Sequence, residues 1–307
     1  MKLHQLRALD AVARLGGIRA AARELALSQP ALTKALRELE AATSLKLLER
    51  GNRGAVLTEA GTRLLIRSRV VFRELEYAEM EMRQLAGHDK GRISIAISPV
   101  LGQMILSKAY SLFNKQFPNI SLRFLPAFTR SSMAAVADGT IDFAVVLLQG
   151  IETSANVIVE PWFDVEHRIV ARIGHPLGTS TTVAQALAQD WALTNATGGG
   201  QFDLLAKLCA ENNAPLPHVI HEAASSSLLV ALVGGTDLLT FAPMLGQGFS
   251  NPPLQVIECP EVIGLKRKFG LIRRADGYLS PALVALRNEI QRLSYDHIAA
   301  VTPLKAR

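Results

Sequence analysis

The chain has 307 residues, of which 49% are hydrophobic, and a net charge of +6. This length and apolar content allow two or three domains with substantial cores and exclude a wholly disordered chain. Two cysteines, Cys209 and Cys259, exclude a disulfide scaffold and agree with a reducing compartment. No signal-peptide core opens the chain and no apolar run approaches the roughly 20 residues that span a bilayer, so we expect a cytoplasmic protein.

The positive charge is concentrated at the N-terminal end. Residues 1–73 contain 14 Lys and Arg against 6 Asp and Glu, a net of +8, whereas the remaining residues contain 19 against 21, a net of −2. This distribution favours a local polyanion-binding surface over a generally basic protein. A membrane-surface helix could carry the same charge, but the helices expected here are short and capped, which favours nucleic acid.

Two short helices are predicted at the start of the chain, over residues 3–15 and 20–25. Apolar residues recur through the first at helical spacing, and the pair Gly16-Gly17 would end it. Residues 26–28 predict a turn after the second. The side chains expected to face inward from the first helix are Leu3, Leu6, Leu9, Val12 and Ala13.

A third helix is predicted over residues 29–42. Ser28 can cap it by accepting from one of its first free N–H groups, and Pro30 lies where a missing N–H costs least. The outer face carries amide, hydroxyl and cationic groups, which meet base edges and phosphates in a major groove. This layout is typical of a helix-turn-helix, although a plain amphipathic surface helix would have the same face. The inward stripe is Ala31, Leu32, Ala35, Leu36 and Leu39, and the outer face is Gln29, Thr33, Lys34 and Arg37.

A β-hairpin is predicted over residues 47–58. Two short apolar strands flank a turn that contains Gly and Asn, with Arg50 and Arg53 at its tip. A basic hairpin directly after a helix-turn-helix is typical of a wing that contacts phosphates. The hairpin therefore favours DNA binding over a plain surface helix.

The first 65 residues resemble the LysR-type transcriptional regulators. Gly17 and Arg19 stand where the family usually has Ser and Thr, and Thr43-Ser44 where it usually has Leu-Gly, which affects the expected DNA sequence preference more than the fold. The matching residues are Ala21, Ala22, Leu25, Ser28, Gln29, Pro30, Ala31, Leu32, Leu39, Glu40, Leu47, Arg50, Leu57, Thr58, Ala60 and Gly61. We predict a winged helix-turn-helix domain over residues 1–58 that contacts DNA through Arg19, Ser28, Gln29, Pro30, Thr33, Lys34, Arg37, Arg50 and Arg53.

Residues 59–87 predict one long linker helix. At about 1.5 Å per residue it would be roughly 43 Å long, which is too long for a small head to cover. A helix packed on its own chain is the alternative, but a regular seam with charged flanks favours pairing with a second copy. A dimer would place two recognition helices on one face of DNA. The seam is polar at Ser68, and its apolar positions are Leu64, Val71, Leu75, Ala78, Met82 and Leu85.

Strands and helices alternate from residue 91 onward, which predicts a parallel sheet with covering helices. Strands are expected over residues 92–98, 120–125, 141–147, 166–171, 192–194, 218–221, 238–241 and 268–272, and helices over 101–117, 131–138, 182–188, 201–212, 225–233 and 281–293. The pattern resembles the two-lobed, periplasmic-binding-protein-like α/β effector domain of the same family. That resemblance implies an effector-binding domain over residues 88–307, with lobe I at 91–162 and 268–307 and lobe II at 163–267.

Three loops are candidates for a ligand site, at residues 98–103, 128–132 and 197–202. Ligands of open α/β sheets bind beyond the carboxyl ends of strands, where helix N-termini offer N–H groups to an anion. A glycine run can also be an ordinary turn, and Arg130, the only guanidinium in these loops, can pair with a carboxylate or stay solvated. By resemblance these loops line the inducer pocket, with Ser98, Pro99, Val100, Gly102, Thr129, Arg130, Gly199, Gly200 and Phe202 as effector-binding residues. We expect a small carboxylate or similar anion as effector.

An enzyme is the rival class, and it has no positive feature in the sequence. His218 and His221 would point to opposite faces of a strand, which disfavours a metal pair. A catalytic Ser elbow, a phosphate-loop consensus and a CxxC motif are all lacking. We therefore expect no catalytic residue, no metal site and no cofactor. A nucleoid-type or membrane-bound structural protein would leave the second half of the chain unexplained.

The predicted function is ligand-responsive transcription regulation. The partners we expect are double-stranded DNA, bound at an interrupted palindrome, and further copies of the chain as dimers and tetramers, with RNA polymerase as a candidate and no membrane. Some relatives in the family sense peroxide through two cysteines, so a redox-responsive or effector-independent regulator is the alternative. The helical pattern around Cys209 instead favours a buried structural thiol.

Overall fold

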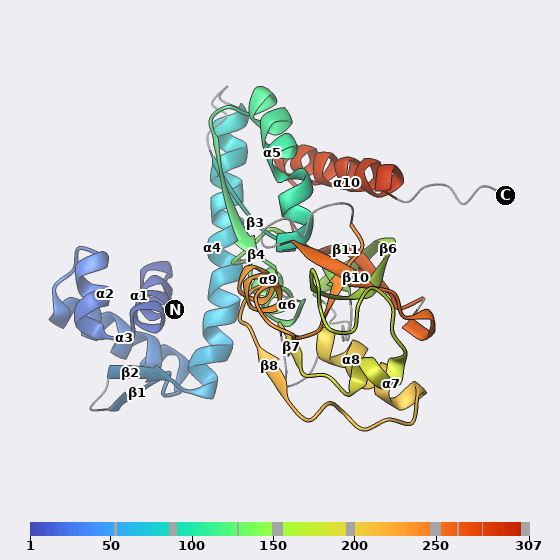
Figure 1. Cartoon of the computed structure of the whole chain (residues 1–307). Helices are drawn as coiled ribbons and strands as arrows, with labels where there is room; N and C mark the ends of the chain where they lie inside the picture. The colour runs from blue at the N-terminus through green and yellow to red at the C-terminus, as the bar shows by residue number, and fades with distance from the viewer. Residues whose placement is uncertain are drawn as a thin grey trace. The chain divides into compact units, whose positions relative to one another are not determined.

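The chain forms two compact units that divide near residue 88. Helices α1 to α4 and the hairpin β1–β2 belong to the first, and the remaining labelled elements of Figure 1 belong to the second. The computed structural model describes residues 1–51, 54–85, 91–127, 129–148, 156–194, 200–245, 253–262, 264–277 and 279–301, without the side chains of residues 50, 51, 54, 80, 83–85, 129, 130 and 301.

The N-terminal unit is a three-helix head followed by a hairpin and a long helix. Its elements are α1 (Leu3–Leu15), α2 (Ile18–Glu24), α3 (Gln29–Thr43), β1 (Leu48–Gly51), β2 (Gly54–Leu57) and α4 (Glu59–Leu85). All three predicted helices and the hairpin are therefore confirmed, with ends shifted by at most two residues. The linker helix is confirmed over residues 59–85, and its predicted end at residue 87 lies outside the described residues. Leu9, Leu32, Leu36, Leu39 and Leu47 are fully buried in its core.

Two of the side chains predicted to face inward are exposed. Leu3 and Ala31 both lie in the first turn of their helices, beyond the reach of the core. The inward stripe of α3 therefore begins one residue later, at Leu32. Periodicity gives the direction of a helix face but not where its neighbours end, which explains the difference.

Gly61 fixes the start of α4 against the hairpin. A Cβ at this position would lie 2.0 Å from the carbonyl oxygen of Leu47, so only glycine fits. The N–H of Thr58 donates to that same carbonyl at 3.0 Å, and the Thr58 hydroxyl accepts from the N–H of Gly61 at 3.0 Å. The long helix is thus joined to the head by a close backbone contact.

The second unit contains a mixed sheet, and the expectation of a parallel sheet was wrong in part. Strands β3 (Gly91–Ile97), β4 (Ile120–Pro126) and β5 (Phe143–Leu148) are parallel, but β11 (Lys266–Arg274) runs antiparallel between β5 and β6 (Val157–Arg172). The strand order is β10-β6-β11-β5-β3-β4, with β9 also on β6. The alternation of strands and helices indicated the first three strands correctly but could not indicate the direction of a strand that returns from far along the chain.

Strand β6 belongs to both lobes of this unit. Residues 157–166 pair with β11, and residues 167–172 pair with β9 (Thr240–Pro243) and β10 (Leu254–Ile257). The strand predicted over residues 166–171 begins earlier, at Val157, and continues through Pro161 with a register irregularity, which is where a strand tolerates proline. β10 was not predicted.

Each lobe has its own core. In lobe I, α5 (Pro99–Gln116) and α10 (Pro281–Val301) pack together over one face of the sheet, on Ile95, Phe143 and Leu271 (Figure 1). In lobe II the core surrounds Trp191, Leu205 and Phe241. The other elements are α6 (Thr129–Ala137), α7 (Val183–Leu187), β7 (Trp191–Leu193), α8 (Gln201–Glu211), β8 (Ile220–Glu222), α9 (Ser226–Gly234) and the 3-10 turn Pro260–Val262.

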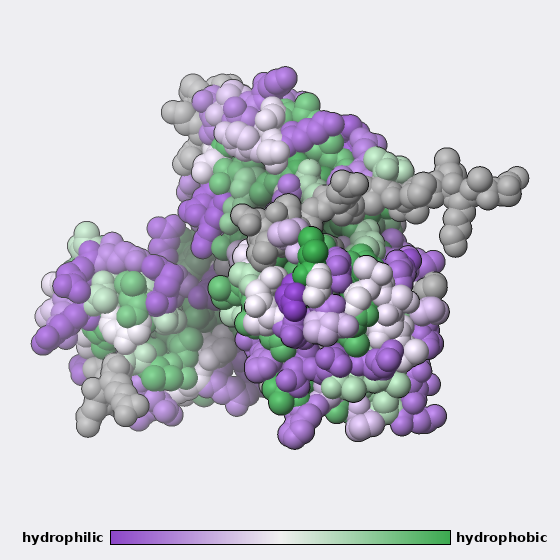
Figure 2. All heavy atoms as spheres, viewed as in Figure 1, coloured by the Kyte–Doolittle hydropathy of each residue, from purple (hydrophilic) through white to green (hydrophobic). Residues whose placement is uncertain are grey.

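Hydrophilic residues cover much of the visible surface of each unit, and apolar residues lie between them (Figure 2). Among the described residues, every helix is too short or too polar to cross a membrane. The buried hydrophobic residues form separate cores in the N-terminal unit and in the second unit.

Candidate DNA-binding and effector-binding sites

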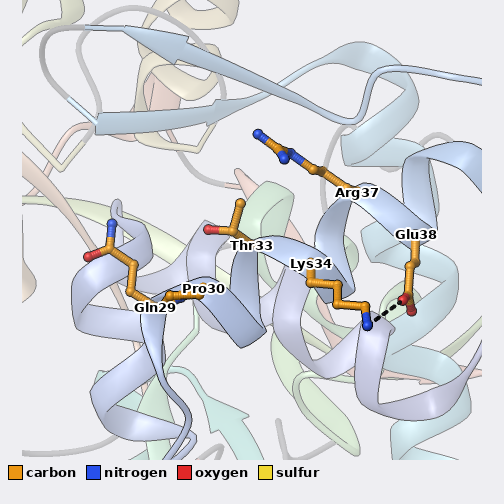
Figure 3. Close-up of a pocket in the computed structure, with 6 residues that line it drawn as sticks. All are labelled: Gln29, Pro30, Thr33, Lys34, Arg37 and Glu38. Carbon is orange, nitrogen blue, oxygen red and sulfur yellow. Dashed lines mark ion pairs between the residues drawn. The ribbon is translucent and has the colours of Figure 1, made fainter.

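Helix α3 presents a polar face that is built by its own N-terminus. The Ser28 hydroxyl accepts from the N–H of Ala31 at 3.3 Å, and Pro30 lies in the first turn, as predicted. Gln29, Thr33 and Arg37 follow at four-residue steps and project from one side of the helix (Figure 3). This puts an amide, a hydroxyl and a guanidinium in one row, which is suited to contact with base edges and phosphates.

An open hollow of about 540 Å³ lies along this face (Figure 3). Glu38, which the sequence reasoning missed, takes part in it: its carboxylate accepts from the Gln5 side chain at 3.1 Å and lies 4.0 Å from the Lys34 ammonium. Lys34 is 78% exposed, so this ion pair is weak and leaves the cation available to a phosphate. The lining residues are Gln29, Pro30, Thr33, Lys34, Arg37 and Glu38.

The hairpin is attached to the recognition helix through Glu40. The Glu40 carboxylate accepts from the N–H groups of Leu47 and Leu48, at 2.9 and 3.3 Å, and so fixes the start of β1. Arg50 lies on β1, with its side chain outside the described residues, and Arg53 lies outside them entirely. Arg19 is exposed on the first turn of α2.

The predicted seam of α4 is open over most of its length. Val71, Leu75 and Met82 are 45%, 40% and 57% exposed, and Ala78 is exposed as well. Leu64 instead packs against the core of the N-terminal unit, and the buried Ser68 hydroxyl donates to the Leu64 carbonyl at 2.8 Å. The side chain of Leu85 lies outside the described residues. Among the described side chains, an exposed apolar stripe therefore begins at Val71, beyond the head.

Two of the three predicted ligand loops meet at one edge of lobe I. Because β3 and β4 are parallel, their carboxyl ends lie together, and the N–H of Ala127 donates to the Ile97 carbonyl at 3.0 Å. Helix α5 begins there after Ser98, and α6 begins there with Thr129 and Arg130, whose side chains lie outside the described residues. The Ser98 side chain is nearly buried and does not cap its own helix. Two helix N-termini thus point to the same edge.

Other predicted pocket residues have packing roles. Pro99 and Val100 are half-buried, Val100 against the lobe I core, and Gly102 is buried in the first turn of α5. In lobe II, Phe202 packs against the core. Gly200 has a φ of +58° and precedes α8 without a capping side chain, whereas Gly199 is outside the described residues.

The two cysteines are buried in the lobe II core. Burial raises the pKa of the Cys209 thiol, and burial together with the nearby Glu261 carboxylate raises the pKa of Cys259 to about 11. Both thiols are therefore protonated at neutral pH, and a protonated thiol reacts slowly with oxidants. This disfavours the redox alternative.

Arg267 on β11 is a further polar group that the sequence reasoning missed. It is only 7% exposed, and the strand alternation places it on the same face as Phe269 and Leu271, which belong to the lobe I core. That alternation was the available signal, but the strand predicted there began at residue 268 and therefore left Arg267 outside it.

The two units define a DNA-binding regulator with a ligand-binding domain, and comparison with known proteins identifies its family. Residues 3–62 match the model "Bacterial regulatory helix-turn-helix protein, lysR family", and residues 86–294 match "LysR substrate binding domain". The chain therefore belongs to the LysR family of transcriptional regulators, which are not enzymes.

Relatives and solved structures agree with this assignment. The chain is 28% identical over 242 residues to the regulator TdcA of Escherichia coli K12, covering 79% of this chain and 77% of TdcA. It is 28% identical over 241 residues to the RuBisCO operon regulator of Allochromatium vinosum, covering 78% of each chain. The fold is similar to that of full-length CbnR solved with its target DNA, with a TM-score of 0.66 and 18% identity over 95% of this chain and 100% of that one.

Proposed function

We propose that the protein binds an interrupted palindrome in double-stranded DNA as a dimer, and that a small effector changes its conformation on the DNA. The row of Gln29, Thr33 and Arg37 on α3 carries this proposal. A recognition helix of this kind reads one half-site in the major groove, and a two-fold dimer reads two half-sites about one helical turn, or a multiple of it, apart. The open stripe at Val71, Leu75 and Met82 supports pairing of two α4 helices.

Selection of bound sequences from random double-stranded DNA by the full chain tests this proposal. We expect enrichment of two half-sites related by a two-fold axis, with a spacing that is the same in all enriched sequences. The variant Gln29→Ala should lose this enrichment, whereas Lys207→Ala, an exposed change on α8, should keep it. Enriched sequences without two-fold symmetry would contradict the proposal.

The proposed effector is a small carboxylate at the edge where α5 and α6 begin. Ser98 and Thr129 start these helices, and Gly200 starts α8 in the other lobe, so hydroxyl and N–H donors favour an anion. The double variant Ser98→Val and Thr129→Val should abolish the response to ligand and leave basal DNA binding unchanged. Loss of basal binding as well would mean that these residues serve the fold.

Pairing of dimers into tetramers and contact with RNA polymerase are further parts of the proposal that rest on family membership. Closure of the two lobes on the effector would change the angle between paired dimers. Sedimentation of the full chain on a DNA duplex with both half-sites, with and without effector, distinguishes two bound copies from four.

A further inference from the structure

The side chain of Arg267 is buried and has no hydrogen-bonded counter-charge among the residues that the structure describes. It is 7% exposed, and its Nε atom is inaccessible to solvent and has no hydrogen-bond partner in the described part of the chain. Burial of a guanidinium costs free energy unless carboxylates or other acceptors replace the lost water. An arginine in this state needs either a structural partner or a ligand.

Other arginines of the same two strands show what a structural partner looks like. The Nε atoms of Arg168 and Arg273 donate to Glu166 at 2.9 Å and to Glu160 at 2.6 Å, and that of Arg172 donates to Asp237 at 2.7 Å. Each of these guanidinium groups is more exposed than that of Arg267. Of these four arginines, Arg267 is the most buried, and among the described residues it has no carboxylate in hydrogen-bond contact.

Arg267 lies where the two lobes join. Strands β6 and β11 cross between the lobes side by side: Arg267 is in register with Val165, and the N–H of His167 donates to the Leu265 carbonyl at 2.8 Å. Val165 belongs to the lobe I core, whereas Leu265 belongs to the lobe II core. The guanidinium is therefore held at the junction that a ligand between the lobes would touch.

The start of α8 lies within electrostatic range of the same guanidinium. Burial lowers the pKa of Arg267 to about 10, and Asp203, in the first turn of α8, opposes that shift. Asp203 is the third residue of a helix of 11 residues, and Gly200, the N-cap residue before that helix, supplies no capping side chain. The Gln201 side chain, at the start of α8, donates to the Phe241 carbonyl at 2.5 Å, and Phe241 is in register with Ile169 on β6. The positive end of the α8 dipole is thus held against the strand that runs beside Arg267.

We infer that Arg267 binds the carboxylate of the effector, with the first turn of α8 as the second group that holds the anion. This deepens the proposed effector-binding function and rests on it. A guanidinium binds a carboxylate through two parallel N–H···O bonds, which a lysine cannot reproduce. A monoanion is favoured over a phosphate dianion because Asp203 already places one negative charge beside the guanidinium.

Thermal unfolding of the full chain tests the inference. The probes are acetate, succinate, benzoate and salicylate, with acetamide and benzamide as neutral partners and inorganic phosphate as the dianion, all at constant ionic strength. At least one carboxylate should raise the unfolding midpoint of the wild type, by about 5 °C at a hundredfold excess over Kd, and its amide should not.

Three variants locate the effect. Arg267→Met should abolish the carboxylate shift while its own midpoint without ligand stays at or above that of the wild type, because it removes a buried charge that has no hydrogen-bonded carboxylate among the described residues. Arg267→Lys should retain at most a small part of the shift. Lys268→Met is the matched control: it removes one positive charge from the neighbouring, exposed position of the same strand and should keep the full shift.

Several results would overturn the inference. These are a carboxylate shift that persists in Arg267→Met, a wild type that responds only to neutral compounds or to phosphate, and a wild type that responds to no carboxylate. DNA binding of the same samples separates the two levels of the proposal. If a carboxylate raises the unfolding midpoint through Arg267 but does not change the DNA complex, the proposed function is contradicted. If a neutral compound changes the DNA complex equally in the wild type and in Arg267→Met, only the role of Arg267 is contradicted.

Discussion

The two units place their polar chemistry in opposite environments. In the N-terminal unit the functional groups are exposed on α3, above a core that is almost entirely apolar. In the second unit the polar groups of interest, among them Ser98, His167 and Arg267, are buried at helix starts or at the junction of the lobes. A polyanion as large as DNA can be bound only by side chains that are exposed on the surface, whereas a small ion is bound strongly only where water is excluded.

This contrast has a direct consequence for mutants. Substitutions on the exposed faces should change association with DNA or with a second copy and leave the free energy of unfolding nearly unchanged. Substitutions at buried positions should change that free energy or the response to ligand.

The largest effect is expected at the open stripe of α4. Val71→Glu together with Leu75→Glu removes two apolar contacts from each chain and adds like charges, so the dimer dissociation constant should rise by at least about a thousandfold. Analytical ultracentrifugation of the full chain measures it. The control pair Glu74→Ala and Glu79→Ala lies on the same helix outside the stripe. An unchanged dimer in the Val71 and Leu75 variant would show that α4 packs in another way.

A buried position of the same unit should affect folding instead. Gly61→Ala places a Cβ 2.0 Å from the Leu47 carbonyl oxygen, so backbone must move, at a cost of roughly 3 kcal/mol in the free energy of unfolding. Gly17→Ala is the matched control, since nothing lies within 4 Å of the added Cβ there. Urea unfolding compares the two variants. Equal stabilities would mean that the head and α4 are not joined by the contact described here.

The pH dependence of stability should report the buried groups of the second unit. Burial, with the charge of Arg267 as a smaller cause, lowers the pKa of His167 to about 3. Between pH 6.5 and 3, His167 is therefore protonated in the unfolded chain but not in the folded chain. Stability should fall as the pH is lowered through this window, by up to about 1.4 kcal/mol per pH unit.

The variant His167→Gln should flatten this dependence, whereas His221→Gln, at an exposed position, should leave it as in the wild type. Urea unfolding of each protein at pH 7, 6, 5 and 4 gives the slopes. Parallel slopes for the wild type and His167→Gln would contradict the assignment.

Smaller effects are expected on the DNA-binding face. There, mutation of a residue that contacts a base edge should change the affinity for one DNA sequence, whereas mutation of a residue that contacts phosphate should change the affinity for all sequences. Gln29→Ala should cost about 1–3 kcal/mol on the preferred DNA site only, because an amide reads a base edge. Binding measured on the preferred site and on a scrambled duplex gives this difference. An equal loss on both duplexes would place Gln29 on the phosphates.

Arg53→Ala should weaken binding nearly equally on all sequences and reduce the salt slope by about one unit, as expected for one lost phosphate contact. Titrations of the same duplexes over a range of salt concentrations measure the slope. A sequence-dependent loss with an unchanged slope would refute the role of Arg53 on the phosphates. Neither Gln29→Ala nor Arg53→Ala should alter the free energy of unfolding, because neither side chain is expected to contribute to a buried core.

Much of the N-terminal unit followed from local signals. The Ser28 cap, the Pro30 start, the Gly16 end and the row of Gln29, Thr33 and Arg37 depend on residues within a few positions of one another, so the sequence alone predicted them correctly. The errors there, at Leu3 and Ala31, concern only how far a neighbouring core extends.

Tertiary structure decided what depends on residues distant in the chain. It was needed for the antiparallel insertion of β11 and for the continuous β6 shared by both lobes. The same holds for Arg267, which the sequence shows as the middle of a basic run and the fold buries beside His167. The sequence determines periodicity and caps because these act over one or two helical turns. Burial and the pairing of charges depend on strands that lie about a hundred residues apart in the chain, so only the folded molecule shows them.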